Sequence, residues 1–409
     1  MNSRLKIQRL KILIAGVCSL MLMLGIARFA YTPMMPLMQQ QAGLGVAAGG
    51  WLASINYLGY LSGVLLAASI SNLSVKFRLY RLGIVLAVLT TAAMALTSSF
   101  YIDQVYLWAV MRYLAGFSSA AGVMFGSGLI LHWLLKNNLR SELGIHFSGA
   151  GLGIALGALI IELSSQLSWQ QQWWLLALLG LLLALPAWCY LPRPSAALKA
   201  PQSLTATTVK VAVTGRLAVQ SPSLQYLRLF MAFYACAGVG YVISATFIVA
   251  IIDSQTSKGE SSSGNFAFLL LGLAAAPACI VWDLVARRMG DLNTLIIVSL
   301  LHIISIILPL LQHTLWAAYA STLLFGATFI GLVSLVLSMA GRYYPASPAK
   351  MMGKMTLGYC VAQILAPAII AVMVANGGTY REGLLLGAGA MVLGVGFLWR
   401  MKTSIRSAC

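Results

Sequence analysis

Two arginines stand inside long apolar runs of this 409-residue sequence. Arg28 lies in the stretch G-I-A-R-F-A-Y-T-P-M-M-P (residues 25–36), within an apolar run that begins at Ile12, and Arg112 lies in a second run that begins at Val105. An ionisable residue within a membrane span is costly, so it marks a functional site that faces a cavity or a partner. A guanidinium in such a place attracts a carboxylate or a similar anion.

The acidic residues all fall at the ends of the apolar runs or between them: Asp103, Glu142, Glu162, Asp253, Glu260, Asp283, Asp291 and Glu382. No carboxylate is therefore expected deep in a span to neutralise Arg28 or Arg112, which favours an anionic substrate. The same absence argues against a relay of carboxylates for protons. His146 has a side chain that titrates in the useful pH range, but we interpret it as an interfacial histidine.

The composition predicts the elements that must position these arginines. The chain is 60% hydrophobic and 8% charged, whereas a soluble domain has about 25% charged residues. The apolar blocks are about 20 residues long and show no alternation, which indicates transmembrane helices and not a barrel. The net charge of +18 comes from short basic clusters between the blocks, so we exclude nucleic-acid binding. No cysteine or histidine cluster has metal spacing, and we expect no cofactor and no metal.

Twelve helical spans are predicted, at residues 12–37, 47–70, 80–99, 105–134, 143–165, 172–191, 226–252, 265–286, 292–312, 315–338, 352–376 and 383–400. With the N-terminus inside, all but four of the 26 basic residues fall on the cytoplasmic side. The four are Lys258 and Arg381 outside, and Arg28 and Arg112 within spans. The positive-inside rule then places both termini in the cytoplasm, and we expect the chain in the cytoplasmic (inner) membrane.

The chain is predicted to consist of two six-helix halves, residues 1–191 and 226–409, joined by a cytoplasmic linker at 192–225. An offset of 210 overlays residues 144–160 on 354–370 and Gly116 on Gly326. An offset of 213 overlays the segment 25–28 on 238–241. The fold class is therefore an all-α integral membrane protein with pseudo-symmetric halves, and a substrate site is expected near the midplane between them.

Helical rise places Arg28 roughly 24 Å from the inner surface and Arg112 roughly 10 Å from the outer one, at similar levels of a ~30 Å core. We predict that both arginines attract the substrate. Tyr31, Asn56, Tyr241 and Gln363 lie near the same depth and are predicted to orient it. In span five, Gly149, Gly153 and Gly157 share one helix face and would let another helix approach closely. We favour simple packing for them, and conformational rocking is the alternative.

Three motifs carry a family resemblance. They are the stretch 25–38, the segment G-W-L-A-S-I-N-Y-L-G-Y at 50–60, and the R-x-x-x-G element from Arg112 to Gly116. The whole chain resembles a major facilitator superfamily transporter, and the first two motifs are similar to its YbfB/YjiJ-type branch. The resemblance implies alternating access, and the glycine-rich span five resembles antiporters. The superfamily's cytoplasmic signature is poorly kept, because residues 71–81 lack its acid.

We therefore expect a secondary transporter, monomeric and not an enzyme, that moves a small organic solute across the lipid bilayer. The favoured candidate is an exporter of an anionic compound, with the proton as a candidate coupling ion. Import or export of a neutral or drug-like compound is the alternative. A lipid-modifying enzyme needs catalytic residues grouped at one membrane face, and a membrane sensor usually carries a soluble domain, and the sequence has neither feature. No ATP-binding loop is present.

Overall fold

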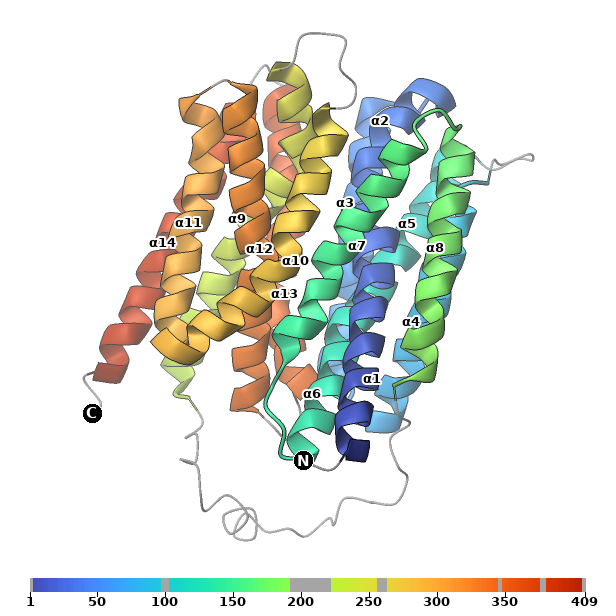
Figure 1. Cartoon of the computed structure of the whole chain (residues 1–409). Coiled ribbons are helices and arrows are strands. Elements are labelled where there is room, and N and C mark those ends of the chain that lie inside the picture. Colours follow the sequence, from blue (N-terminus) through green and yellow to red (C-terminus); the bar gives the residue numbers. More distant parts are fainter. Residues whose placement is uncertain are drawn as a thin grey trace.

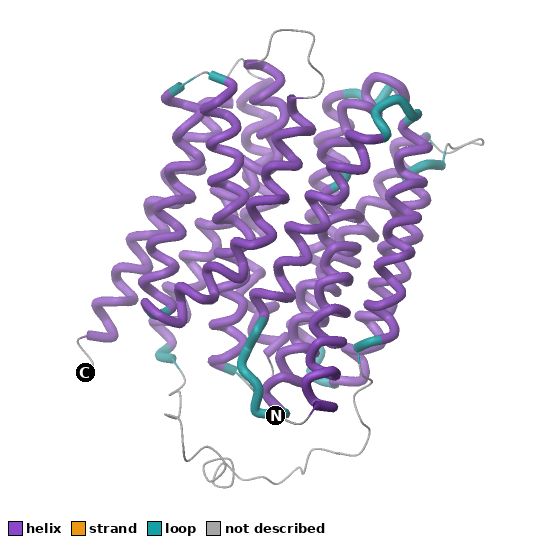
Figure 2. The backbone as a smooth tube through the Cα atoms, in the orientation of Figure 1, coloured by secondary structure: helices purple, strands orange, loops and turns teal. Residues whose placement is uncertain are grey.

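The computed structural model describes residues 3–96, 103–191, 222–255, 263–312, 314–344, 348–375 and 380–406. These residues are helical over most of their length (Figure 2). The elements in chain order are α1 (Ser3–Leu20), the π-helix η1 (Met21–Phe29), α2 (Tyr31–Ala42), α3 (Val46–Ser69), α4 (Leu73–Ala93), α5 (Gln104–Ala120), the π-helix η2 (Ala121–Gly126), α6 (Ser127–Lys136), α7 (Leu143–Leu163), α8 (Trp169–Cys189), α9 (Leu224–Gln255), α10 (Ser263–Met289), α11 (Asp291–Leu311), α12 (Leu315–Tyr343), α13 (Pro348–Ala375) and α14 (Tyr380–Arg406).

The helices form two groups that lie side by side (Figure 1). Elements α1 to α8 make one group and α9 to α14 the other, and the start of α1 and the end of α14 lie at the same, lower end. Ten helices of the described chain are long and apolar enough to cross a membrane. The two other long helices are α4, which packs on α5 and α8, and α13, which packs on α3 and α9. The predicted architecture of a multi-pass membrane protein in two helical halves is confirmed.

The first, third and fourth predicted spans differ most from the observed helices, and the fourth is interrupted by η2 between α5 and α6. The first span is not one regular helix, because η1 interrupts it between α1 and α2. The third helix begins at Leu73, where the side chain of Asn72 accepts hydrogen bonds from two backbone amides of the first turn. That cap starts the helix seven residues before the predicted residue 80. Most of the predicted linker, residues 192–221, lies outside the described residues.

Glycines at equivalent places of the two halves hold equivalent helix pairs close together. Gly116 in α5 lies against α3, where an added Cβ would overlap the carbonyl oxygen of Asn56. Gly326 in α12 lies against α10 in the same way, beside the carbonyl oxygen of Leu271. The sequence offset of 210 thus joins residues with the same packing role.

The second sequence offset joins equivalent glycines as well. Gly25 in η1 lies against the backbone of Gly153 in α7, and Gly238 in α9 lies against the backbone of Tyr359 in α13. In each half, the first helix of the half therefore meets the fifth at a glycine. This agreement supports a common origin of the helix packing in the two halves.

The seam between the halves runs along α7 and α10. Gly144 and Gly151 of α7 lie against the backbone of α10. Asn265 of α10 donates a hydrogen bond of 2.5 Å to Glu162, near the far end of α7. Small residues at spacings of three and four let the two backbones approach along the whole seam.

The lower ends of the halves are also in contact. Gly128 of α6 lies against Ala349 of α13, and Gly353 of α13 lies against the backbone of Ala68 in α3. An added Cβ on Gly128 would lie 2.6 Å from the Cβ of Ala349, so no path for a solute passes between these helices. The lower end is closed at these contacts.

A methyl group at Gly116 should be costly, because the atom that it meets is backbone of a packed helix. We expect Gly116→Ala and Gly326→Ala each to lower the stability of the protein by about 1–3 kcal/mol or more. Gly50→Ala is the control, since an added Cβ there meets nothing within 4 Å, and alanine favours the helix by about 1 kcal/mol. Thermal unfolding in one detergent measures the difference, and equal midpoints for the three variants would contradict the repeat packing.

Candidate functional site

Arg112 is bound to the broken end of the first span. Pro33 has no N–H, so it cannot donate to the backbone carbonyl of Phe29 four residues before it, and the helix is irregular at this junction. The guanidinium of Arg112, from α5, donates to the carbonyl oxygens of Ala27 at 3.0 Å and Arg28 at 3.1 Å. Polar backbone groups inside a membrane need partners from the protein itself, and Arg112 supplies a donor to each of these two carbonyls. Arg112 therefore stabilises the junction between η1 and α2.

Two other polar side chains hold the same junction in the N-terminal half. The ring of Tyr31 lies under Arg112, with its centre 4.4 Å from the guanidinium carbon, and its hydroxyl donates to the carbonyl oxygen of Gly49 at 3.0 Å. Asn56 donates to the carbonyl oxygen of Arg112 at 2.7 Å. Each of these groups is paired within one half. They position η1 against α3 and α5.

Arg28 has a different environment, although it is next to Arg112. Its side chain is 5% exposed, and its guanidinium carbon lies 4.3 Å from the ring centre of Tyr60 and 5.0 Å from that of Tyr57. The three ion pairs found in the described chain do not include Arg28. Its Nε–H has no hydrogen-bond partner, as is also true of the Nε–H of Arg112, so the two arginines differ in the backbone bonds that Arg112 makes. Arg28 is thus a buried cation that aromatic faces stabilise and no carboxylate neutralises.

Arg28 faces a cavity of about 40 Å³ between the two halves. The side chains of the N-terminal half that line it are Leu24, Arg28, Phe29, Tyr60, Val123 and Phe147, and those of the C-terminal half are Tyr241, Phe329, Ile330, Val333, Tyr359 and Gln363. The volume is enough for about two or three water molecules. Pockets for small molecules are usually ≈ 300–1,000 Å³. A solute would therefore need the halves to separate.

The C-terminal wall of the cavity is aromatic. Tyr241 stacks on Phe329 at 5.5 Å and on Tyr359 at 5.7 Å between ring centres. Gln363 lies beside this stack, is 2% exposed, and its Oε1 has no hydrogen-bond partner. The cavity therefore offers one cation from one half, and flat apolar faces and an unpaired acceptor from the other.

Three of the six predicted substrate residues line the cavity: Arg28, Tyr241 and Gln363. The two arginines lie at one level, as helical rise predicts, because Arg112 bonds to the backbone of Arg28. Tyr31, Asn56 and Arg112 are instead engaged with backbone groups of their own half. The sequence analysis did not select Phe329 or Tyr359 for the cavity. Their only signal is their place in spans ten and eleven.

The glycines of α7 lie on two faces. Gly149 and Gly153 contact the backbone of α1 and η1. A Cβ added at Gly157 would lie 3.9 Å from the Cβ of Ala30. The seam with α10 uses Gly144 and Gly151 instead, which lie on another face of the same helix. The predicted face therefore packs within one half, and sequence analysis missed the face that joins the halves.

His146 is buried among the helices of the N-terminal half. It is 0% exposed, and its Nε2 lies 2.9 Å from the hydroxyl of Ser127. Its Nδ1 has no partner and faces Gly16 of α1. His146 lies one turn into α7, and α1, α6 and α7 enclose the ring. His146 does not line the cavity.

Comparison with known proteins gives one family and one fold. The family model described as "Uncharacterised MFS-type transporter YbfB" matches residues 20–398. Among solved structures, a mutant of the nucleoside transporter NupG is similar, with a TM-score of 0.65 and 15% sequence identity. The match covers 96% of this chain and 99% of that one, and at this identity it is a likeness of fold. The comparison with curated proteins gives no match.

Removing the two arginines should have different effects on stability. Arg112→Met removes two charge-assisted hydrogen bonds to buried backbone carbonyls, so we expect a loss of about 2–5 kcal/mol. Arg28→Met removes a buried charge without an ion pair, so its apolar replacement should leave stability unchanged or raise it by about 1–4 kcal/mol. Thermal unfolding of both variants in one detergent measures the contrast. An equal loss in both would contradict the assignment of Arg112 to the junction and of Arg28 to the cavity.

Proposed function

We propose a substrate class and a binding mode for this chain, which belongs to the YbfB-type family of MFS transporters. As a member of that family it is a secondary transporter in a membrane and not an enzyme. Its substrate is a small organic solute with a carboxylate or a similar anionic group. That group binds Arg28 in the central cavity. The main support is a buried guanidinium that faces the cavity without a carboxylate beside it.

Energetics favour an anion at this place. Burying an unpaired guanidinium costs several kcal/mol even after relaxation. Each cation–π contact of Arg28 contributes about 0.5–2 kcal/mol, so the aromatic neighbours compensate the cost only in part. A carboxylate from a solute would form charge-assisted hydrogen bonds with the same group, the unpaired Nε–H included. The ion pair between Arg28 and the solute would therefore contribute to the free energy of binding.

The other predicted residues take two kinds of role. Tyr241 and Gln363 contact the body of the solute from the C-terminal half, and the free Oε1 of Gln363 accepts a hydrogen bond from it. Arg112, Tyr31 and Asn56 act indirectly, because they hold the backbone from which Arg28 projects. The solute would therefore bridge the two halves, with its charge on one side.

Transport by alternating access follows from this bridging position. The cavity of about 40 Å³ is too small for an organic solute, so the halves must move apart to admit it. The contacts at the lower end then open or close as the halves rock about the seam of α7 and α10. One chain supplies both walls of the cavity, and we propose that it works as a monomer.

Orientation and coupling extend the proposal. The basic residues gather at the lower end, which we assign to the cytoplasm of a cell with an inner membrane. Both termini then lie in the cytoplasm. The glycine-rich α7 resembles antiporters, and we propose export in exchange for protons.

A second candidate is a neutral aromatic or drug-like solute. The stack of Tyr241, Phe329 and Tyr359 favours it, because flat rings bind flat solutes. Nucleosides belong to this class, and the similar fold is that of a transporter named for them. Arg28 distinguishes the candidates, since only an anion gains from its charge.

Ligand binding should depend on the charge of the solute and on Arg28. In a thermal-shift screen of purified protein, we expect carboxylates to raise the midpoint temperature of unfolding. Their uncharged amides should need at least a tenfold higher concentration for the same rise. Arg28→Met should abolish the carboxylate effect. The control is Arg81→Met, since Arg81 stacks on Trp188 and Phe77 and does not line the cavity. Stabilisation by neutral or cationic compounds alone would contradict the anion proposal and support the second candidate.

Inside-out membrane vesicles test the orientation and the coupling together. An epitope on the C-terminus should be accessible to antibody in these vesicles, because the cytoplasmic face points outward. An acidic lumen should drive uptake of a carboxylate found by the screen, and a protonophore should abolish that uptake. An epitope that antibody cannot reach would show that the C-terminus lies on the opposite side of the membrane. Uptake that does not depend on the pH gradient would exclude exchange with protons.

A further inference from the structure

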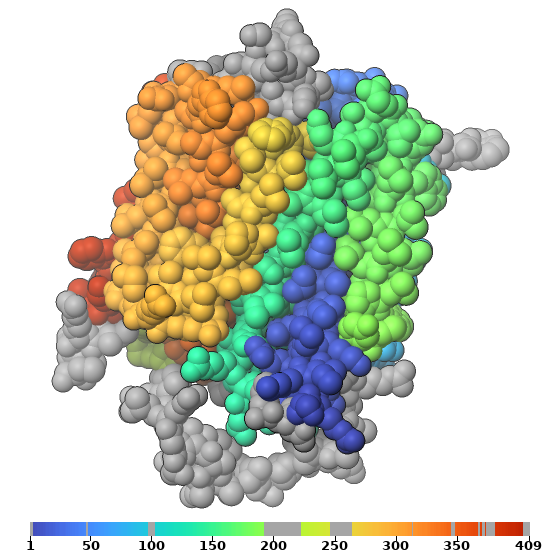
Figure 3. Space-filling view, viewed as in Figure 1, coloured from blue at the N-terminus to red at the C-terminus, as the bar shows by residue number. Residues whose placement is uncertain are grey.

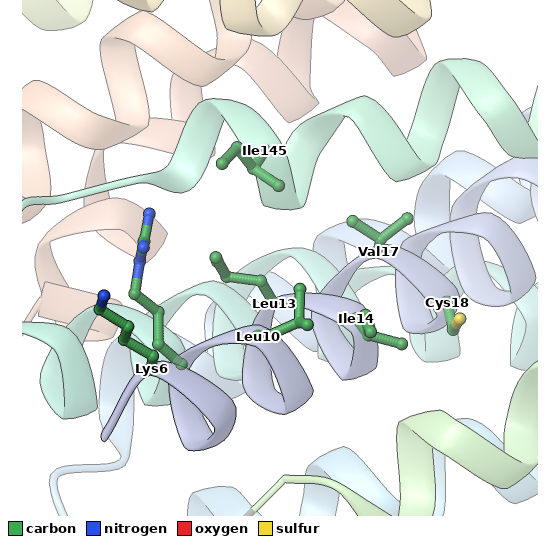
Figure 4. Close-up of a pocket in the computed structure, with 8 residues that line it drawn as sticks. Lys6, Leu10, Leu13, Ile14, Val17, Cys18 and Ile145 are labelled. Carbon is green, nitrogen blue, oxygen red and sulfur yellow. The ribbon is translucent and has the colours of Figure 1, made fainter. Parts of the chain in front are cut away.

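A second cavity, of about 310 Å³, lies along α1 from Lys6 to Cys18, and it shares no lining residue with the central cavity. Lys6 and Arg9 stand at one end of it, and Leu13, Val17 and Cys18 continue along α1 towards the other. Ile145 of α7 closes the opposite wall. Figure 4 shows Lys6 and Cys18 at opposite ends of the row of α1 side chains, with Ile145 across from them. We call this cavity the α1 groove.

The α1 groove opens at the outer surface of the protein. In the space-filling view, α1 lies on the surface between α7 and α8 (Figure 3). Leu10 and Ile14, which line the groove, are 60% and 37% exposed. Between Leu10 and Cys18 the lining is apolar, so the surface faces hydrocarbon in a membrane. An acyl chain fits this lining.

The charge at the end of the groove is not fully matched by the protein. Arg9 forms two hydrogen bonds with the carboxylate of Glu142, at 2.7 and 2.5 Å. Lys6 is exposed at the rim and takes part in none of the ion pairs found in the described chain. A lysine at the level of lipid headgroups attracts anionic ones, with about 1 kcal/mol for each basic residue. The groove therefore pairs an apolar channel with a free cation.

The groove crosses the headgroup region and enters one leaflet. Lys6 and Cys18 are separated by about 18 Å along the helix axis, and about 9 Å of this, from Ile12 to Cys18, lies in the predicted hydrocarbon core. A lysine at the rim and a channel of this length fit a headgroup and one acyl chain of a lipid in the same leaflet. A soluble anion would use the lysine and leave the apolar walls uncovered.

We propose that the α1 groove binds an anionic glycerophospholipid. Its phosphate lies at Lys6, and one acyl chain runs past Leu13 and Val17 towards Cys18. This inference does not depend on the substrate of the central cavity, because none of the groove residues lines that cavity.

Native mass spectrometry of the full-length protein tests the lipid site. The probes are phosphatidylglycerol and phosphatidylcholine with the same chains, and glycerol phosphate as the headgroup without chains. We expect phosphatidylglycerol to bind the wild type more tightly than phosphatidylcholine. Lys6→Ala should weaken phosphatidylglycerol about fivefold and leave phosphatidylcholine unchanged. Lys11→Ala is the matched control, since the ammonium of Lys11 lies over the ring of Tyr190 and away from the groove.

A second variant tests the apolar part of the site. Ile14→Trp adds bulk at the exposed wall of the groove and should weaken both phospholipids, whereas glycerol phosphate should bind poorly to every variant. Equal binding of the two phospholipids to the wild type would overturn the proposal. So would equal losses in Lys6→Ala and Lys11→Ala, or competition by glycerol phosphate at the concentration of the phospholipid, which would indicate a site for phosphate alone.

Discussion

A guanidinium buried in a membrane without a carboxylate is the constraint around which the central site is arranged. Arg28 is 5% exposed and lies among aromatic rings that stabilise its charge only in part. Without a partner of opposite charge, the desolvation of this guanidinium destabilises the folded protein. A buried charge inside a membrane usually marks a functional site. Here the Arg28 side chain faces the cavity that both halves line. The account therefore treats Arg28 as one half of an ion pair that the substrate completes.

Arg112 holds in position the backbone from which Arg28 projects. Pro33 interrupts the backbone hydrogen bonds of the first span, and Arg112 donates to the carbonyl of Arg28 and to that of the residue before it. The helix break is thereby fixed in position. The two guanidinium groups carry like charges and repel each other. Arg112 donates to the backbone carbonyls of Ala27 and Arg28, whereas the Arg28 side chain faces the cavity. The charge at the site is asymmetric, because the repeat counterpart of Arg28 is Tyr241, which lies in the facing aromatic wall.

Much of this arrangement can be predicted from the sequence, since helical rise and hydrophobic length are local properties. They place Arg28 and Arg112 at one level, and the offset between repeats joins Gly116 to Gly326 with the same packing role. The rest depends on partners that lie far apart in the chain. Whether Arg112 faces a ligand or two backbone carbonyls depends on how the first span packs against α5. Likewise, the burial of His146 depends on how α1 and α6 cover it. The two glycine faces of α7 look alike in sequence, and only the positions of α1 and α10 distinguish them.

A structure of the protein with a bound carboxylate solute tests the central claim most directly. The account predicts that the anionic group lies within hydrogen-bond distance of the Arg28 guanidinium, with its Nε–H paired and with the cavity enlarged. Tyr241 and Gln363 should contact the rest of the solute, while Arg112 keeps its bonds to the backbone carbonyls. A solute bound with its anionic group on Arg112, or away from both arginines, would contradict the account.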